Sequence, residues 1–199
     1  MTEIVLIGSG GHAKSCLEVI RTKKNIKVVG YVSNLKEKVK IFRYLGADKD
    51  LIKIRKKYHN VHLGIGFIKN YKLRLRIINK LKKLKFFFPK IISNNSLVSK
   101  NAKIGNGTIV MNFCIVNYDA QIGENSIINN KALIEHDVKI GSNCHISTSV
   151  TINGNCKIGN NTFIGSGVIV NNGVKIGNNC LVGSGLTIKK DMRDHEIKK

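Results

Sequence analysis

The chain has 199 residues, and 34 Lys and Arg against 12 Asp and Glu give it a net charge of +22. No run approaches the roughly 20 apolar residues that a membrane span needs, and the short apolar start lacks the basic flank of a signal peptide. The cysteines number five, an odd count that argues against a disulfide framework. We therefore expect a cytoplasmic protein without stable membrane insertion.

The start of the chain predicts a β-α-β unit. Its loop, Gly8–Ala13, fits the G-x-G-x-x-A pattern, in which glycines let backbone N–H groups approach a pyrophosphate. The acid that would bind a ribose is absent, because Ser33 and Asn34 follow the second strand. A nicotinamide cofactor is therefore not expected, whereas a phosphate or nucleotide-diphosphate ligand remains possible. The predicted elements are a strand over 3–8, a helix over about 14–21 and a strand over 27–32.

Two further elements complete this half of the chain. A short strand is predicted around 61–66, followed by a basic amphipathic helix over about 71–84. That helix carries Tyr71, Leu75, Ile78 and Leu81 on one face, which favours core packing over membrane docking. Residues 1–90 are thus predicted to form a small α/β domain.

The positive charge is concentrated in this domain. Residues 1–91 hold 23 Lys and Arg against 5 Asp and Glu, which gives +18 of the total +22. Such a field would attract nucleic acid, anionic lipid or phosphorylated small molecules. There is no nucleic-acid-binding motif, no Trp and no aromatic stacking platform. We expect a solvated basic surface and no nucleic-acid partner; a nucleic-acid-binding protein, the open alternative, would bind any polyanion with steep salt dependence.

The second half of the chain has a strict period of six. Every sixth residue from Ile92 to Ile188 is Ile or Val, and a register four residues later is always small or apolar. This period is typical of a hexapeptide parallel β-helix, in which each short strand directs one large and one small residue into a narrow prism. Glycines such as Gly105 and Gly123, and pairs such as Asn106-Gly107 and Asn160-Asn161, are expected at corners where positive φ is cheap. Residues 91–199 are therefore predicted to form the β-helix domain.

The small register also holds four of the five cysteines. Cys114, Cys144, Cys156 and Cys180 occupy positions that a β-helix directs inward, so we expect buried core thiols. Disulfides, metal ligands and nucleophiles are not expected from them.

One polar cluster interrupts the repeat, at Glu135-His136-Asp137. A neutral imidazole accepts a proton near pH 7, and an adjacent carboxylate raises its basicity and holds its tautomer. An exposed surface histidine beside ordinary charges remains the alternative. His145 is the one other histidine within the repeat and His195 is expected beyond its last coil, so three zinc ligands are not available there and no metal is expected.

Four motifs stand out along the chain: Ile7–Lys14 (IGSGGHAK), Gly30-Tyr31, Gly64-Ile65-Gly66 and Ala132–Asp137 (ALIEHD). Together they resemble the bacterial sugar acetyltransferases of the sialic acid O-acetyltransferase group, which includes the N-acetyltransferases of nucleotide-linked 4-amino sugars. The resemblance spans nearly the whole chain, and it implies that residues 1–90 bind a nucleotide sugar.

The resemblance implies a left-handed β-helix with three hexapeptides per coil, a homotrimer with active sites between subunits, and direct transfer from acetyl-CoA. It implies that His136 removes a proton from the acceptor amine or hydroxyl. Asp137, rather than Glu135, would raise the basicity of His136, and Asn129 would contact the acceptor.

The resemblance also implies the residues that bind the donor and the acceptor. The acetyl-CoA thioester and pantetheine would be contacted by His145, Ser166, Ser184 and Gly185. The nucleotide or sugar end of the acceptor would be held by Gly10, Gly11, His12 and Gly66.

Some features depart from that family. Ser33-Asn34 replaces an Asp pair that reads the nucleotide base, Arg74 lies further from Gly66 than the family's arginine, and a closing Gly-x-Pro-Ala-Lys signature is missing. The leading hypothesis is N-acetylation of a nucleotide-linked amino sugar for bacterial surface glycans. The alternatives are O-acetylation of sialic acid or a related sugar, and a non-catalytic trimer that binds sugar nucleotides.

Overall fold

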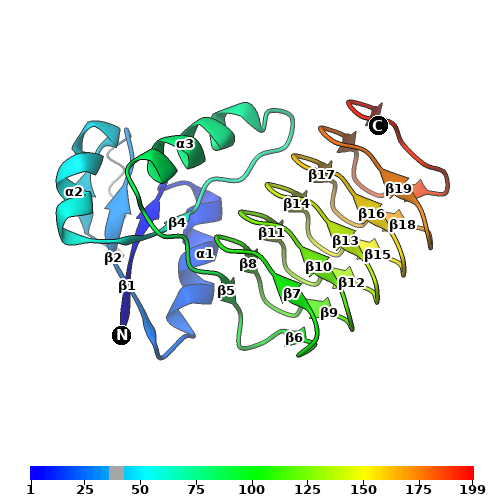
Figure 1. The fold of residues 1–199 in the computed structure, drawn as a ribbon, viewed down its shortest axis with the longest axis horizontal. Coiled ribbons are helices and arrows are strands. Elements are labelled where there is room, and N and C mark those ends of the chain that lie inside the picture. The colour runs from blue at the N-terminus through cyan, green and yellow to red at the C-terminus, as the bar shows by residue number, and fades with distance from the viewer. Residues whose placement is uncertain (36–42) are drawn as a thin grey trace. The chain divides into compact units, whose positions relative to one another are not determined.

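The computed structural model describes residues 1–35 and 43–199, which divide into two compact units (Figure 1). Unit 1 comprises Met1–Gly66 and Lys72–Pro89, and unit 2 comprises Phe67–Tyr71 and Lys90–Lys199. The chain therefore leaves unit 1 after Gly66, contributes a short segment to unit 2, and then returns. No helix in the described part of the chain is long and apolar enough to cross a bilayer.

Unit 1 is an α/β fold built on a parallel sheet of strand order β3-β2-β1-β4. The β1-α1-β2 unit predicted from the sequence is present, with β1 pairing in parallel with both β2 and β4. Its elements are β1 (Thr2–Ile7), α1 (Gly11–Arg21), β2 (Ile26–Val32), β3 (Tyr44–Gly46), a 3₁₀ turn (Asp48–Asp50), α2 (Leu51–Lys57), β4 (Asn60–Leu63) and α3 (Lys72–Lys83).

Several boundaries differ from the sequence expectation. Helix α1 begins at Gly11 rather than near Lys14, because Gly10 adopts the extended conformation of an N-cap and the next residues form the first turn. Strand β4 ends at Leu63, so Gly64–Gly66 is a loop. Strand β3 and helix α2 were not predicted, since each is too short to show a clear periodicity.

Helix α3 buries an unexpected residue. Ile78 and Leu81 are buried as predicted, and they join Val5, Ile7 and Leu63 in a core cluster. Arg74 lies on the same helix and is only 2% exposed. Its guanidinium donates a hydrogen bond to the Ile65 carbonyl, and burial lowers the Arg74 pKa to about 10. The helix therefore anchors the loop after β4 through a buried cation.

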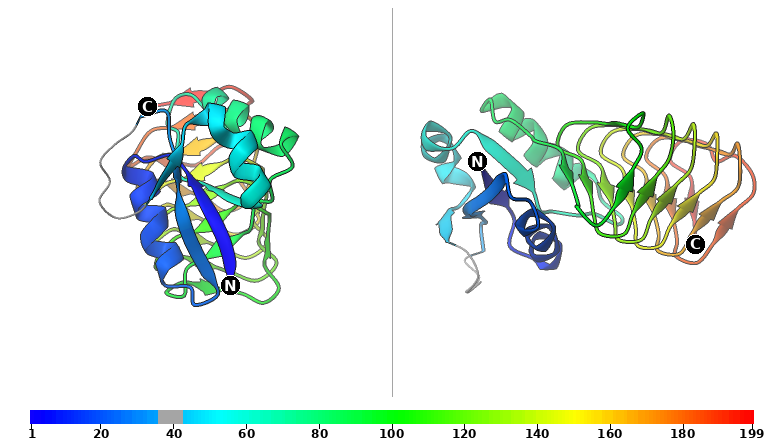
Figure 2. Two further views of the ribbon diagram at one scale, coloured as in Figure 1. Left: turned by 90° about the vertical axis from the view of Figure 1, so that its left-hand side faces the viewer. Right: turned by 90° about the horizontal axis from the view of Figure 1, so that it is seen from below.

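Unit 2 is a parallel β-helix of two-residue strands, and its stacked rungs are visible from below in Figure 2. Each strand pairs with the strand three places further along the chain, so one coil holds three strands. Three sheets result, of five, seven and six strands. The fold is the left-handed β-helix that the resemblance implied. The strands that carry the repeat are β5 (Ile91–Ile92), β6 (Leu97–Val98), β7 (Lys103–Ile104), β8 (Ile109–Val110), β9 (Ile115–Val116), β10 (Gln121–Ile122), β11 (Ile127–Ile128), β12 (Leu133–Ile134), β13 (Lys139–Ile140), β14 (His145–Ile146), β15 (Thr151–Ile152), β16 (Lys157–Ile158), β17 (Phe163–Ile164), β18 (Ile169–Val170), β19 (Lys175–Ile176), β20 (Leu181–Val182) and β21 (Thr187–Ile188).

The prism interior is filled by the two predicted registers. The Ile/Val register and the small register form one core cluster, and all five cysteines of the chain are free and buried. The small register also makes hydrogen bonds: the thiols of Cys114, Cys144 and Cys156 each lie 3.0 Å from a backbone carbonyl oxygen of the next coil. The small residues that carry a donor group therefore have two roles: they fill the interior, and they donate hydrogen bonds to carbonyl oxygens at the corners.

The corners follow one backbone rule. Every sixth residue from Gly107 to Gly185 has a positive φ, whatever its type, and Asn161 follows this rule with φ 58°. The expectation for glycines such as Gly105 and Gly123 was wrong, because neither has a positive φ. A Cβ at Gly105 would lie 2.6 Å from backbone atoms of the next coil. These glycines are thus required by close approach between coils.

The last coil is shorter than the others. Strand β22 (Ile197–Lys198) pairs with β20 through Leu181 and Ile197, which are closer in sequence than the partners in the other coils. His195, expected to fall beyond the β-helix, lies in this shortened coil with φ 64°. The repeat in the sequence ends at Ile188, but the coiling of the backbone continues past it.

Candidate active site

His136 and Asp137 form a hydrogen-bonded pair at a corner of the β-helix. The distance from His136 Nδ1 to Asp137 Oδ2 is 2.8 Å, and both side chains are about half exposed, at 54% and 52%. A carboxylate oxygen only accepts, so Nδ1 carries the proton of this hydrogen bond, and in the neutral ring the lone pair is on Nε2. Asp137 has φ 60°, the left-handed conformation shared by this position in each hexad. The pair is therefore a histidine held in the tautomer of a general base.

Glu135 makes a different contact. Its Oε2 accepts a hydrogen bond of 2.8 Å from Asn117 Nδ2, one coil earlier. Of the two carboxylates that flank His136, only Asp137 is hydrogen-bonded to the imidazole.

The imidazole occupies space left by a glycine on the next coil. Gly154 stands one coil after His136, and a Cβ there would be 2.6 Å from His136 Cε1 and 2.7 Å from Nε2. The same Cβ would lie 3.0 Å from Asn172 Oδ1. Contacts below about 3.0 Å are not tolerated, so a side chain at Gly154 would displace the ring. The sequence analysis missed this residue, although its place three hexads after His136 is a signal that could have identified it.

A second feature of unit 2 is a cavity of about 460 Å³. His145, Ser166 and Ser184, three of the residues expected to bind the cofactor, line it together. Ser147 Oγ and Ser166 Oγ are 2.9 Å apart, which fixes the polar edge of the wall. The volume lies within the usual range of small-molecule sites. Its lining residues are Ile68, Lys69, His145, Ser147, Phe163, Ser166, Leu181, Gly183, Ser184 and Lys199.

His145 is held in a fixed tautomer. Its Nδ1 lies 2.8 Å from the Phe67 carbonyl oxygen, and because a carbonyl only accepts, Nδ1 must carry the proton. The ring packs edge-on against Phe163, with centroids 5.2 Å apart and an interplanar angle of 87°. His145 is 8% exposed and therefore forms a rigid part of the cavity wall.

Gly185 and Asn129 lie near the same corner. The Gly185 N–H donates to the Ser166 carbonyl at 2.8 Å, and its φ of 75° suits a glycine. Asn129 stands one coil before Ser147, and its side-chain oxygen accepts the Asn130 N–H at 2.8 Å. Neither Gly185 nor Asn129 is among the residues that line the cavity.

The cavity and the histidine pair occupy different corners of the prism. The cavity lies where the seven-stranded sheet turns into the six-stranded sheet, and His136 follows β12, where the six-stranded sheet turns into the five-stranded sheet. The six-stranded sheet separates them. Its outward side chains are largely apolar, and Leu97, Ile115 and Ile169 are 71%, 38% and 43% exposed. One chain therefore does not bring His136 and the cavity residues together on one corner.

The glycine-rich loop of unit 1 stands at the carboxyl end of β1, where parallel sheets bind ligands. A Cβ at Gly10 or Gly11 would meet no atom within 4 Å, so the start of α1 faces open space. His12 Nε2 lies 3.5 Å from Cys16 Sγ one turn further along the helix. Ser9 Oγ donates to Ser33 Oγ at 3.1 Å, which ties the loop to the end of β2.

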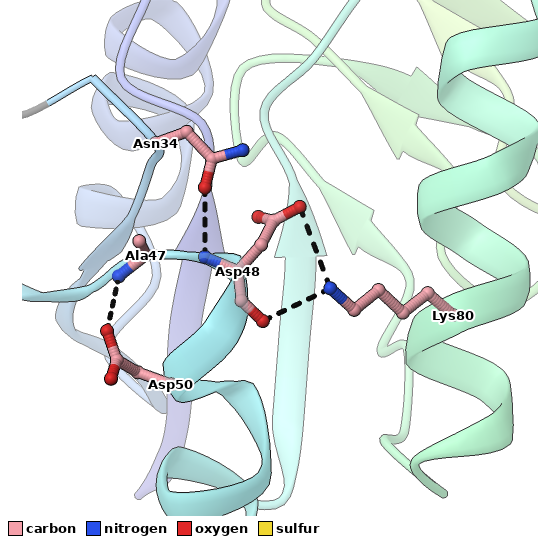
Figure 3. A network of polar contacts seen from close by, with 5 residues as sticks. All are labelled: Asn34, Ala47, Asp48, Asp50 and Lys80. Carbon is pink, nitrogen blue, oxygen red and sulfur yellow. Dashed lines mark hydrogen bonds and ion pairs between the residues drawn. The ribbon is translucent and has the colours of Figure 1, made fainter.

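The residue that replaces the expected acid also has a defined partner. Figure 3 shows the Asn34 side-chain oxygen accepting the Asp48 N–H, at 3.0 Å. Lys80 from α3 donates to the Asp48 carbonyl at 3.1 Å (Figure 3). Asn34 therefore takes part in a network that joins β2, the 3₁₀ turn and α3. Gly66, the last expected substrate residue, ends the loop that Arg74 anchors.

No group of three or more His, Cys, Asp or Glu among residues 1–35 and 43–199 is placed to hold one metal ion.

Two protein families match this chain. Residues 3–81 match the PglD N-terminal domain, and residues 101–136, 119–154 and 155–190 match the bacterial transferase hexapeptide family (six repeats). Together the two matches span most of the sequence.

Named relatives agree with these matches. The chain is 30% identical over 116 residues to the UDP-N-acetylbacillosamine N-acetyltransferase of Bacillus subtilis (strain 168); the match covers 56% of this chain and about half of that protein, 52%. A histidine-to-asparagine mutant of perosamine N-acetyltransferase from Caulobacter crescentus, solved with CoA and GDP-perosamine, superposes with a TM-score of 0.92, 28% identity and coverage of 99% and 93% of the two chains.

A further similar structure is the acetyltransferase domain of PglB from Neisseria gonorrhoeae in complex with acetyl coenzyme A. It has a TM-score of 0.89 and 25% identity, and the match covers 98% of this chain and 94% of that one. The chain thus belongs to the bacterial hexapeptide-repeat sugar acetyltransferases that carry an N-terminal domain of the PglD type.

Proposed function

We propose that this protein transfers the acetyl group of acetyl-CoA to the amino group of a nucleotide-linked amino sugar used for surface glycans. The observation that carries the proposal is the His136–Asp137 pair, whose imidazole lies over Gly154 and donates from Nδ1 to the Asp137 carboxylate. Support comes from the similar structure that holds CoA together with GDP-perosamine, a nucleotide-linked amino sugar.

The chemistry follows from the tautomer of His136. Acetyl-CoA supplies a thioester that an amine attacks directly, so a C–N bond forms as the C–S bond breaks. His136 Nε2 takes the proton that the amine loses, and the carboxylate of Asp137 stabilises the imidazolium that results. The proton then passes from His136 to the sulfur of the departing thiolate. Asn129 is proposed to orient the acceptor.

The cavity of about 460 Å³ fits the donor end of this reaction. We assign the thioester and pantetheine to the wall made by His145, Ser166, Ser184 and the adjacent Gly185. This wall has apolar side chains and a few fixed polar groups, as small-molecule sites usually do.

Unit 1 is proposed to hold the nucleotide end of the acceptor. Gly10 and Gly11 leave the backbone N–H groups at the start of α1 open to a diphosphate, and His12 stands in the first turn beside them. Gly66 belongs to the loop fixed by Arg74. The five free buried thiols agree with a reducing cytoplasm as the place of the reaction.

We further propose a homotrimer whose active sites are completed across subunits. The site proposed for the donor and the general base lie on different corners of one chain, and the exposed apolar face between them suits contact with another copy. A mixing experiment tests this: His136→Ala and Ser166→Trp are each inactive, and unfolding and refolding them together restores part of the activity. If the mixed protein stays inactive while each variant remains folded, each site lies within one chain.

The reaction itself is tested with acetyl-CoA and a panel of acceptors. The panel contains UDP- and GDP-linked amino sugars, free sialic acid and CMP-sialic acid, and release of free CoA is measured. Turnover of an amino sugar, lost in His136→Ala and retained in His59→Ala, supports the proposal; His59 is an exposed histidine of unit 1. Turnover of sialic acid alone would establish O-acetylation instead. No turnover with a folded protein that binds sugar nucleotides would favour the non-catalytic trimer.

A further inference from the structure

The segment Phe67–Tyr71 belongs to the β-helix unit, although its neighbours on both sides in the sequence belong to unit 1. A segment that leaves its own unit in this way needs contacts that hold it in place, because ordering each residue costs conformational entropy.

Phe67 provides that anchor. Its side chain is 8% exposed and packs against three rings: His145 at 5.9 Å, Phe163 at 6.3 Å and Tyr71 at 6.5 Å between centroids. Its carbonyl oxygen accepts the hydrogen bond from His145 Nδ1 at 2.8 Å. Both the ring and the backbone of Phe67 therefore dock on the cavity wall.

The next two residues are exposed to solvent. Ile68 is 61% exposed and Lys69 is exposed, and both line the cavity of about 460 Å³. The same cavity is lined by the hydroxyl-bearing side chains of Ser147, Ser166 and Ser184. The segment thus places one apolar side chain and one cation at the rim of the cavity, on an anchored backbone.

We propose that Ile68 and Lys69 form a clamp for the bound donor, in which Ile68 packs on the pantetheine arm and Lys69 pairs with a phosphate. This inference rests on the proposed function and assigns to it two residues that the sequence did not indicate. The chemistry matches: the pantetheine arm of CoA is a chain of alkyl and amide groups that is joined to a diphosphate, so an apolar contact followed by a cation suits it. The clamp acts on affinity for the donor, because Ile68 and Lys69 are assigned to the pantetheine arm and a phosphate and not to the thioester that reacts.

The test measures the dissociation constant of CoA by calorimetry, together with KM and kcat for acetyl-CoA. We expect Ile68→Ala and Lys69→Ala each to weaken CoA binding and raise KM by about three- to tenfold, with kcat within about twofold. Lys69→Arg, which keeps the charge, restores binding. The matched controls are Ile52→Ala and Lys53→Ala on α2 of unit 1, where Ile52 is 64% exposed; these leave the CoA dissociation constant unchanged.

Dephospho-CoA identifies the phosphate. If Lys69 pairs with the 3′-phosphate, Lys69→Ala weakens CoA but not dephospho-CoA; if it pairs with the diphosphate, both are weakened, and either result supports the clamp. Wild-type-like CoA binding by Ile68→Ala and Lys69→Ala overturns the clamp alone. A wild-type protein that neither binds CoA nor turns over any acceptor overturns the proposed function, which separates the two failures.

Discussion

Replacing Gly154 with Ala tests the position of His136 without touching its chemistry. The added Cβ would lie 2.6 Å from Cε1 and 2.7 Å from Nε2 of the imidazole, so the ring must retreat by roughly 0.8 Å to reach an ordinary contact of about 3.4 Å. That shift moves Nε2 and strains the 2.8 Å hydrogen bond to Asp137. A displacement of about 1 Å at a reacting group costs on the order of 100-fold in rate.

The fold should tolerate this change. Gly154 has no positive φ, and the atoms it would meet belong to side chains, so the β-helix itself is not strained. We expect kcat to fall about 100-fold, with the CoA dissociation constant and the Tm close to wild type. Gly159→Ala is the contrast, because its Cβ would lie 2.5 Å from backbone atoms of Gly177 and Asn178 and should lower the Tm. Wild-type kcat in Gly154→Ala would refute the requirement for this position of His136.

Three other predictions follow from named contacts. Asp137→Asn should lower kcat at least about tenfold, because it removes the charge that stabilises the imidazolium. Glu135 is hydrogen-bonded to Asn117 instead, so Glu135→Gln should change kcat less than about twofold in the same assay. Burial lowers the His62 pKa to about 3, so between pH 6.5 and 3 the unfolded state binds more protons than the folded state. The free energy of unfolding, measured with urea, should therefore fall by roughly 2 kcal/mol from pH 7 to pH 5. His62→Leu should remove this dependence. Burial raises the pKa of Cys16 and of Cys144 to about 12, so a thiol reagent at pH 8 should label the cysteines only after denaturation, and rapid labelling of the native protein would contradict their burial.

The β-helix was predictable because its period is strict and local. An Ile or Val every sixth residue marks each strand end, and paired strands follow three hexads apart. Contacts between coils were not predictable in the same way. Gly105 looks like a corner residue in the sequence, yet it is required because the next coil passes 2.6 Å from where its Cβ would be. Strand β3 and helix α2 are too short to produce a recognisable pattern.

In the candidate site, too, some features were predictable from the sequence and others were not. The Glu135-His136-Asp137 run identified the histidine, but which carboxylate it contacts depends on side-chain direction, and Asn117 one coil earlier draws Glu135 away. The segment Phe67–Tyr71 gave no signal as a cavity wall, because its contact with His145 joins residues that lie far apart in the sequence. Contacts between residues so far apart in the sequence become apparent only once the whole fold is known.

Because the corner backbone is uniform, the β-helix repeats the same side-chain position at regular intervals along its axis. Since every sixth residue from Gly107 to Gly185 adopts positive φ regardless of its side chain, the conformation that presents His136 and Asp137 exists on every coil. Moving a side chain to the same position on the next coil shifts it by one strand spacing, about 4.8 Å, without rebuilding the chain. The height of a reactive group along the prism can therefore change in fixed steps through substitution alone. Acceptors of different length could be accommodated by choosing the coil that bears the base.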